Sequence, residues 1–395
     1  MQTIIKSGNT DHTQRTLAAK ILAIVLPVSL LLPITFQNIV IFLGLAVLLL
    51  SQASLFKHRI VFPFYLFLGV AVFTSLVSPT HFTGIVNLKS FIWDVLLLFV
   101  LGIFLGSREK ERVYSSLLYA TLIIVGGTLL LYLFIPSALS PVLNRKGLLT
   151  GFLGGRLTYA GVISFLLPLF SVKEVGDNKK LIWIAAFILI LSIAYNLSRS
   201  YYLAVSLFFL FMIIFAGEKR LRIKNCLLFI LFILVIFLNP HTRKRAETVA
   251  EYSKDRSASL RLELWKTGLK ISQKYPFTGL GYEAWHDVAE KYIEKQGTYA
   301  LKEYNKDEGI KKALTGHFHS DYIQMLVNGG IPLFLAFLFL IFYYGWILIK
   351  KNKYIKLTGI GLIIIFLASG FFEYNFGDAE VAHTFFFLLG FLIAH

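Results

Sequence analysis

Two histidines, His317 and His319, stand where a long polar segment runs into an apolar, helix-forming stretch. Histidine is the side chain best able to take up and release a proton near neutral pH. If the following residues form a helix, Tyr322 and Ile323 share the face of His319. His317 joins that face only if the segment is extended. The pattern predicts proton-transfer chemistry at the surface of a membrane, with a structural, hydrogen-bonding role as the alternative.

Two arginines in apolar surroundings are candidates for binding an anion. Arg199 lies in a short polar break, Leu197-Ser-Arg-Ser200, between two apolar runs, and Arg261 lies in the amphipathic segment 257–274. An arginine at membrane depth costs about 2.5–3.5 kcal/mol and usually has a partner or a task. A guanidinium donates two hydrogen bonds at once, which suits a phosphate. The alternative for Arg199 is a surface cation whose side chain reaches out of the bilayer, and the alternative for Arg261 is an ordinary exposed charge on a helix.

Acidic residues gather between the last two apolar runs. Glu373, Asp378 and Glu380 can orient a histidine or accept a hydrogen bond from a sugar hydroxyl, and pairing with an arginine is equally compatible. Arg156 and Arg256 are further candidates for binding a substrate, because each is a cation in a polar stretch on the same predicted side.

The residues do not predict a metal or a cofactor. His317, His319 and Asp321 have no further ligand cluster nearby in the sequence, and the single cysteine, Cys226, excludes a disulfide within the chain. No phosphate-binding glycine loop, dinucleotide fingerprint or nucleophile elbow is present. A transferred group would therefore have to arrive already activated, and a lipid-linked pyrophosphate fits that requirement.

The composition indicates that a membrane positions these residues. The chain has 395 residues, of which 56% are hydrophobic and 15% charged, and a mean hydropathy of +0.70. Apolar runs long enough to cross the bilayer must be helices, because lipid offers no partners to backbone groups. The runs lie at 17–35, 38–56, 61–78, 91–107, 113–135, 157–172, 181–198, 201–217, 224–239, 321–349, 356–372 and 379–394. The predicted fold class is an all-α polytopic membrane protein of about twelve transmembrane helices, without a removable signal peptide.

One polar region divides the chain into three parts. Residues 1–239 hold nine predicted spans after a short polar tail, residues 240–320 form one large, mostly helical loop, and residues 321–395 hold the last three spans. Asn239-Pro240 ends the ninth helix because proline lacks the backbone donor. Within the loop, residues 257–274 read as an amphipathic helix that Tyr275-Pro276 ends.

The distribution of lysine and arginine predicts the orientation. Short loops on the side of the N-terminus carry far more basic residues than those on the other side, which is typical of loops facing the cytoplasm. Both termini are therefore expected in the cytoplasm and the large loop outside, in the periplasm of a Gram-negative cell. The net charge of +17 is then a topology signal, and nucleic acid is not implied as a partner.

Four motifs follow one another along the chain: Leu197-Ser-Arg-Ser200, Arg261-Leu-Glu-Leu-Trp265, Pro276-Phe-Thr-Gly-Leu-Gly281, and His319-Ser-Asp-Tyr322 leading to Gly329-Gly330. The glycine pair permits a kink or a close approach of another helix. In this order and on this topology, the motifs resemble the O-antigen ligase and polymerase family of integral membrane glycosyltransferases. The resemblance implies metal-independent transfer of a glycan from undecaprenyl pyrophosphate to a hydroxyl acceptor, at the outer face of the bacterial inner membrane. In ligases this acceptor is a sugar of the lipid A core.

The resemblance also implies roles for individual residues. Arg199 and Arg261 would bind the pyrophosphate and stabilise the leaving group, and His319 would act as general base or orient the acceptor hydroxyl. Asp378 is the weaker correspondence because the last outer loop varies in this family. Two alternatives stay open: a polymerase, whose acceptor is a second lipid-linked repeat, and a transporter of a lipid-linked or anionic solute.

Overall fold

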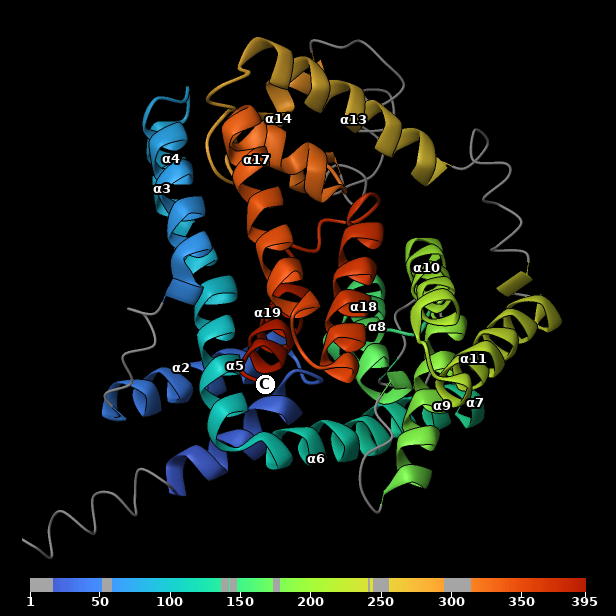
Figure 1. The fold of residues 1–395 in the computed structure, drawn as a ribbon. Coiled ribbons are helices and arrows are strands. Elements are labelled where there is room, and N and C mark those ends of the chain that lie inside the picture. The colour runs from blue at the N-terminus through green and yellow to red at the C-terminus, as the bar shows by residue number, and fades with distance from the viewer. Residues whose placement is uncertain are drawn as a thin grey trace, which may run out of the picture.

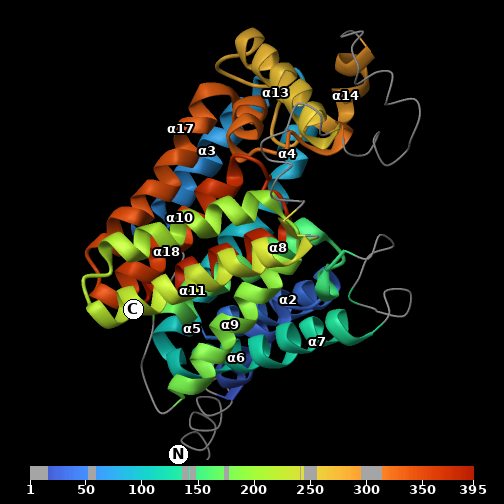
Figure 2. The ribbon, with the colours of Figure 1, turned by 90° about the vertical axis from the view of Figure 1, so that its right-hand side faces the viewer.

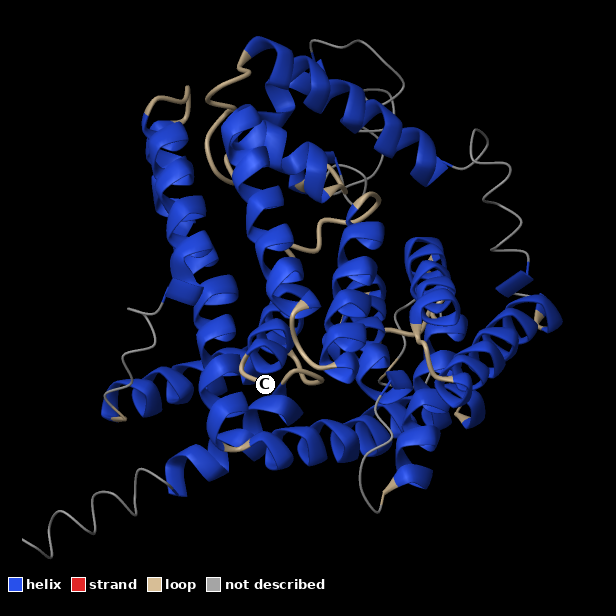
Figure 3. Ribbon diagram, in the orientation of Figure 1, coloured by secondary structure: helices blue, strands red, loops and turns tan. Residues whose placement is uncertain are grey.

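The computed structural model describes residues 17–51, 59–135, 142, 148–172, 178–240, 242–243, 256–294 and 314–395. In these ranges the regular elements are helices, and no strand is present (Figures 1 and 3). Among the described residues, six helical stretches are long and apolar enough to cross a membrane, and shorter apolar helices accompany them. The described part of the chain is therefore all-helical, and the protein is a multi-pass membrane protein, in agreement with the predicted fold class.

The first half of the chain forms the helices from Leu17 to Val172. They are Leu17–Ser29, α2 (Ile34–Leu50), α3 (Phe62–Leu76), α4 (His81–Ser90), η3 (Phe91–Leu96), α5 (Leu97–Arg108), α6 (Lys110–Ala120), η4 (Thr121–Val125), α7 (Gly126–Phe134) and α8 (Arg156–Val172). Short 3-10 turns occupy η2 (Arg59–Val61) and η5 (Gly151–Leu153), whereas η3 and η4 are π-helical.

The second half supplies the remaining spans and the loop helices. They are α9 (Lys179–Tyr195), α10 (Arg199–Phe215), α11 (Lys219–Leu238), α13 (Arg256–Lys274), α14 (Trp285–Glu294), α17 (Asp321–Ile349), α18 (Lys353–Gly370) and α19 (Ala379–Ile393). Each apolar run predicted from the sequence contains helical residues. The amphipathic helix expected at 257–274 is α13.

One predicted span differs clearly from the structure. The apolar pattern predicts a helix over 91–107, but α4, η3 and α5 form one continuous helical stretch, His81–Arg108. The added residues of α4 are more polar, and they contact the loop between α13 and α14: Asn87 donates to the Glu283 carbonyl at 3.1 Å. Hydropathy does not reveal such an extension, because its stability comes from a tertiary contact.

The helix α19 lies at the centre of the molecule, against α5 (Figure 1). Two glycines let these backbones touch. A Cβ on Gly102 of α5 would lie 2.2 Å from the Phe387 carbonyl oxygen, and one on Gly390 of α19 would lie 2.1 Å from that of Phe99. Small residues commonly allow such close packing in membranes, where the hydrophobic effect does not drive helices together.

Replacing Gly102 with leucine should therefore destabilise the protein. The added side chain clashes with backbone atoms, which cannot move aside as a flexible side chain can. Overpacking of this kind lowers the free energy of unfolding by about 1–3 kcal/mol. Thermal unfolding of the purified protein in detergent measures the loss. Gly69→Leu is the matched control, since Gly69 lies in the apolar α3 with nothing within 4 Å of its Cβ position. An unchanged melting temperature for Gly102→Leu would contradict the close α5–α19 contact.

The long helix α17 is broken near its start, as Gly329-Gly330 predicts. Both glycines have non-helical dihedral angles, and the segment that follows α13 fills the break. The amide of Leu280 donates to the Val327 carbonyl at 2.7 Å, and the amide of Ile331 donates to the Pro276 carbonyl at 2.7 Å. Gly330 has φ +65°, and a Cβ there would lie 2.4 Å from the Pro276 carbonyl oxygen. The two glycines thus allow both a kink in α17 and the close approach of the segment that follows α13.

The loop helices α13 and α14 lie together at one end of the molecule (Figure 2). They share a small apolar core that is separate from the core of the spanning helices. Its buried members include Leu264, Ile271, Trp285, Phe318 and Val327. Because Phe318 lies just before α17 and Val327 lies within it, this core fixes the loop helices to the residues around the two histidines.

Candidate functional site

Two cavities adjoin the end of the molecule that carries α13. The first, here called the arginine cavity, has a volume of about 630 Å³, with Arg199, Ser200 and Arg261 among its lining residues. The rest of its wall is largely apolar and includes Leu203, Ile233, Ile236, Phe237, Trp265 and Phe372. The second, the histidine cavity, has a volume of about 370 Å³, and polar residues line most of it. Its lining includes Arg156, Thr158, Tyr201, His317, His319, Glu373, Tyr374, Asn375 and Asp378.

Glu373 stands between the two cavities. The Nη2 group of Arg261 lies 3.1 Å from one Glu373 carboxylate oxygen and 3.2 Å from the other. Ser200 donates from its hydroxyl to the same carboxylate at 2.8 Å. The pair is largely shielded, with side-chain exposures of 20% for Arg261 and 7% for Glu373. Of the two alternatives for the acidic residues, pairing with an arginine is thus found at Glu373, and it holds the Arg261 guanidinium at the border of the cavities.

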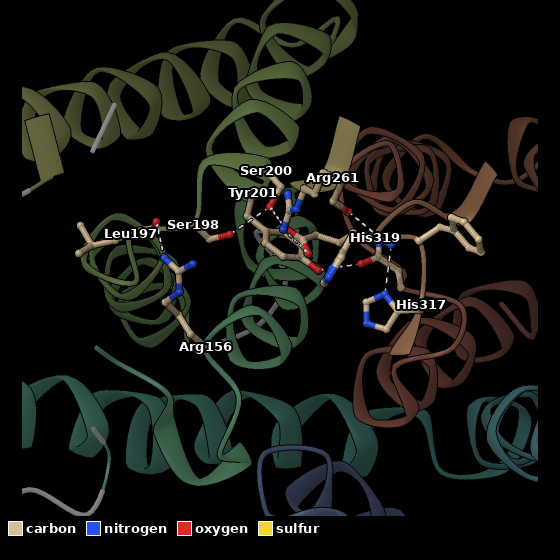
Figure 4. A network of polar contacts seen from close by, with 12 residues as sticks. Arg156, Leu197, Ser198, Ser200, Tyr201, Arg261, His317 and His319 are labelled. Carbon is tan, nitrogen blue, oxygen red and sulfur yellow. Dashed lines mark hydrogen bonds and ion pairs between the residues drawn. The ribbon is translucent and has the colours of Figure 1, made fainter. Parts of the chain in front are cut away.

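The break between α9 and α10 places Arg199 at the first position of α10. Asn196 stabilises this break by donating to the carbonyls of Leu149 at 2.8 Å and Arg156 at 2.9 Å. Leu197 has φ +63°, a backbone conformation that L-residues rarely adopt. Its carbonyl accepts a hydrogen bond from the Arg156 side chain at 2.8 Å (Figure 4). The strained turn therefore presents Arg199 to the arginine cavity and orients Arg156 at the histidine cavity.

His317 and His319 lie side by side in the histidine cavity. Residues 317–320, between a short helical turn and α17, are not helical, and the two ring centroids are 4.2 Å apart. The backbone amide of His319 donates to Nδ1 of His317 at 3.1 Å. A ring nitrogen that accepts carries no proton, so His317 is the neutral tautomer with its proton on Nε2. His319 has φ +50°, and strained residues of this kind cluster at functional sites.

Phe318 anchors the two histidines. Its side chain is fully buried and packs against the Trp285 ring at an angle of 47°, with centroids 4.6 Å apart. Its amide donates to Gln324 at 3.0 Å, and its carbonyl accepts from the Trp265 indole at 2.9 Å. Because Phe318 points into the small core, the residues before and after it are turned toward the cavity.

The other candidates are placed differently. Asp378 lines the histidine cavity, where the Thr158 hydroxyl donates to its carboxylate at 2.7 Å, and burial raises the pKa of this carboxyl. Glu380, in the first turn of α19, is half-buried and does not belong to the described lining of that cavity. Arg256 begins α13, and its side chain lies outside what the structure describes. Asp321 is buried, does not belong to the described lining of either cavity, and accepts from the Phe376 amide at 2.9 Å.

Several residues of the histidine cavity were missed by reasoning from the sequence. Tyr201 donates to the Asn375 side chain at 2.8 Å, and Asn375 donates to the Ser369 hydroxyl at 2.7 Å. Tyr201 and Asn375 lie close to Arg199 and Glu373, in or beside the polar breaks between apolar runs. Their positions next to these candidates could therefore have indicated that they belong to the site. Thr158 carried no such signal, because it lies in an apolar run.

Glu283 contacts Tyr374, which lines the histidine cavity. Its carboxylate accepts from the hydroxyl of Tyr374 and from the Asn328 amide, the latter at 3.1 Å. Burial raises the pKa of this carboxyl above its usual range. A raised carboxyl pKa means that the folded state binds the proton more tightly than the unfolded state. Its contribution to stability is therefore greatest at low pH and falls as the pH rises through the raised pKa.

Glu283→Gln should flatten this pH dependence. Glutamine keeps an acceptor for Tyr374 and Asn328 but does not ionise, so the variant should gain stability relative to the wild type as the pH rises from about 4 to 7. Melting temperatures across this range measure the effect. Asp287→Asn, which removes an exposed carboxylate of α14, should keep the wild-type slope. Parallel curves for wild type and Glu283→Gln would refute the assignment.

Fold and site together define a multi-pass membrane protein that presents guanidinium and imidazole groups on one face. The model of the O-antigen ligase family, Wzy_C, matches residues 184–338. This part of the chain is similar to the O-antigen ligase family, which supports the resemblance seen in the motifs. The matched range contains Arg199, Arg261, His317 and His319. No curated protein matches the chain.

Proposed function

We propose that this protein is a glycosyltransferase that moves an O-antigen polysaccharide from undecaprenyl pyrophosphate to a sugar hydroxyl of the lipid A core. One observation carries the proposal. The apolar arginine cavity ends at Arg199 and Arg261 and borders the polar histidine cavity across Glu373. A lipid-linked donor has the same order of parts: an apolar tail, a doubly charged head and a polar glycan.

The donor head is bound by charge and by a helix end. Arg199 and Arg261 supply two guanidinium groups, and the N-terminus of α10 adds backbone donors with a favourable dipole. Arg261 uses Nη2 to engage Glu373, and its guanidinium has further N–H groups for phosphate oxygens. Leu203, Ile236 and Phe237 provide the apolar wall against which the polyprenyl tail packs.

The reaction is a single displacement. The acceptor oxygen attacks the anomeric carbon, the bond from that carbon to the pyrophosphate oxygen breaks, and His319 takes the hydroxyl proton. Undecaprenyl pyrophosphate leaves with its charge neutralised by the two arginines, so the proposed step needs no metal. His317, Arg156 and Asp378 line the cavity in which the sugars are held. Attack opposite the leaving group inverts the anomeric centre, and a product with retained configuration would reject this mechanism.

The proposed setting is the bacterial inner membrane, with about twelve crossings, both termini in the cytoplasm and the site in the periplasm. Two observations support this orientation. The α13 and α14 end holds both cavities, whereas the basic first turns of α11 and α18 lie near each other, with Lys353 paired to Glu218 at 3.0 Å. Clusters of lysine and arginine at one set of short loops are typical of the cytoplasmic side.

Deletion of the gene in its native cell, followed by electrophoresis of the lipopolysaccharide, tests the function. Loss of all long-chain bands, with polymer accumulating on the lipid carrier, is the expected result for a ligase. A lipid A core that carries a single repeat unit would instead show a polymerase. An unchanged band pattern would exclude both activities in lipopolysaccharide synthesis.

A further inference from the structure

Glu373 lies where the arginine cavity meets the histidine cavity. It lines the histidine cavity, whereas its two hydrogen-bond partners, Ser200 and Arg261, line the arginine cavity. In the proposed reaction, the pyrophosphate of the donor lies in the arginine cavity and the first sugar lies in the histidine cavity. The bond that breaks joins these two parts of the donor, so it crosses the border beside Glu373.

Contacts to three helices hold Glu373 in place. The backbone amide of Glu373 donates to the carbonyl of Ser369, in the last turn of α18, at 2.9 Å. The carboxylate accepts from Ser200, in the first turn of α10, at 2.8 Å and from Arg261 of α13 at 3.1 and 3.2 Å. A charged group that is positioned before the reaction begins needs no reorganisation during it, which is the requirement for electrostatic catalysis.

The negative charge of Glu373 opposes the binding of the donor. A carboxylate has the same sign of charge as a pyrophosphate, and like charges side by side cost free energy. The Glu373 side chain is only 7% exposed, so water screens this repulsion little. Once the donor is bound, its pyrophosphate neutralises Arg261, and the hydrogen bonds from Ser200 and Arg261 need only a neutral acceptor such as an amide oxygen. The charge therefore indicates a function beyond holding Arg261 in place.

Glycosyl transfer produces positive charge beside the bond that breaks. As the bond to the leaving group lengthens, the anomeric carbon and the ring oxygen take on the character of an oxocarbenium ion. A carboxylate next to them is attracted more strongly in the transition state than in the ground state, and only such a difference accelerates a reaction. From the described residues, Oε1 of Glu373 accepts two hydrogen bonds and Oε2 accepts one. A carboxylate has about four acceptor sites, so Oε2 is able to face the sugar as well.

We propose that Glu373 is a catalytic residue whose carboxylate contacts the anomeric centre of the first sugar and stabilises the positive charge that develops there. This role rests on the proposed transferase function. Glu373 forms no bond to the sugar: the acceptor oxygen supplies the electron pair of the new bond, the pair of the breaking bond stays on the pyrophosphate oxygen, and His319 takes the proton. Arg199 and Arg261 then lie where negative charge appears, and Glu373 lies where positive charge appears.

Glu373→Gln tests this role, because it removes the charge and keeps both the length of the side chain and an accepting oxygen. The kcat of transfer should fall by about 10²-fold, the effect of losing one positioned electrostatic group. Binding of undecaprenyl pyrophosphate without a glycan, measured by calorimetric titration of the purified protein, should instead become about threefold tighter or more, because a like charge beside the phosphates is gone. Glu218→Gln is the matched control: it removes a carboxylate paired with Lys353 outside both cavities, and it should change neither quantity.

A second variant, Glu373→Asp, separates charge from shape. Aspartate keeps the charge but shortens the side chain, so Glu373→Asp should transfer faster than Glu373→Gln. The opposite order would overturn the proposal, and so would a wild-type rate for Glu373→Gln. Weaker binding of undecaprenyl pyrophosphate by Glu373→Gln would also overturn it, because the residue would then act only by holding Arg261.

Failure of this role is distinguishable from failure of the proposed function. A wild type that neither binds undecaprenyl pyrophosphate nor transfers a glycan would reject the proposed function, and the role of Glu373 with it. Normal transfer by the wild type, with an equal rate for Glu373→Gln, would reject the role of Glu373 alone. A product with retained configuration would imply a covalent intermediate, which the proposed role excludes.

Discussion

Glycan transfer should fall by about 10²- to 10⁴-fold when His319 is replaced by alanine, with the protein still inserted in the membrane. The expected loss is that of a positioned general base. Purified protein, lipid-linked donor and lipid A-core acceptor allow the rate to be measured directly. His286→Ala is the matched control, because His286 is an exposed histidine on α14 outside both cavities and should transfer at the wild-type rate.

A second substitution at the same position separates proton transfer from orientation. Asparagine tolerates the left-handed backbone found at His319 and can still hydrogen-bond a hydroxyl, but it cannot take up a proton at neutral pH. His319→Asn should be as inactive as His319→Ala if the imidazole is the base. Activity near that of the wild type in His319→Asn would leave only an orienting role, and full activity in His319→Ala would remove His319 from the mechanism.

Arg261→Ala should lower the transfer rate by about 10²- to 10³-fold, mainly through kcat. The guanidinium neutralises charge that develops on the pyrophosphate as the glycosidic bond breaks, and loss of one such donor has an effect of this size. Arg261→Lys should recover only part of the rate, because an ammonium group cannot make the forked contact of a guanidinium. Lys266→Ala, on the exposed side of the same helix, should behave like the wild type.

A double variant distinguishes this role from a structural one. Arg261→Ala alone leaves the largely buried Glu373 without its partner, which lowers stability as well as rate. Adding Glu373→Gln removes the isolated charge, so the melting temperature should recover while the rate stays low. Recovery of the rate together with the melting temperature would show that Arg261 acts only by holding Glu373 and α13 in place.

Much of the fold was accessible from local sequence patterns. The apolar runs, the amphipathic helix at α13 and the break at Gly329-Gly330 all appear in the structure. The extension of the α5 helix back to His81 does not follow from hydropathy, because its more polar residues contact the loop after α13. Arg199, Arg261 and His319 were identified by residue type and position, and the structure brings them to adjoining cavities. Their catalytic roles stay predictions.

The sequence by itself determined that the chain forms apolar helices in a membrane, since each run must satisfy its own backbone groups once water is excluded. It also indicated which polar residues interrupt those runs. Only the tertiary structure decided that Arg261 pairs with Glu373, which lies more than a hundred residues away, and that Glu283 supports Tyr374. The left-handed backbone conformations at Leu197 and His319 could likewise not be predicted from the sequence. Hydropathy is a property of neighbouring residues, whereas these pairs and turns are held by packing between helices that only the folded chain brings together.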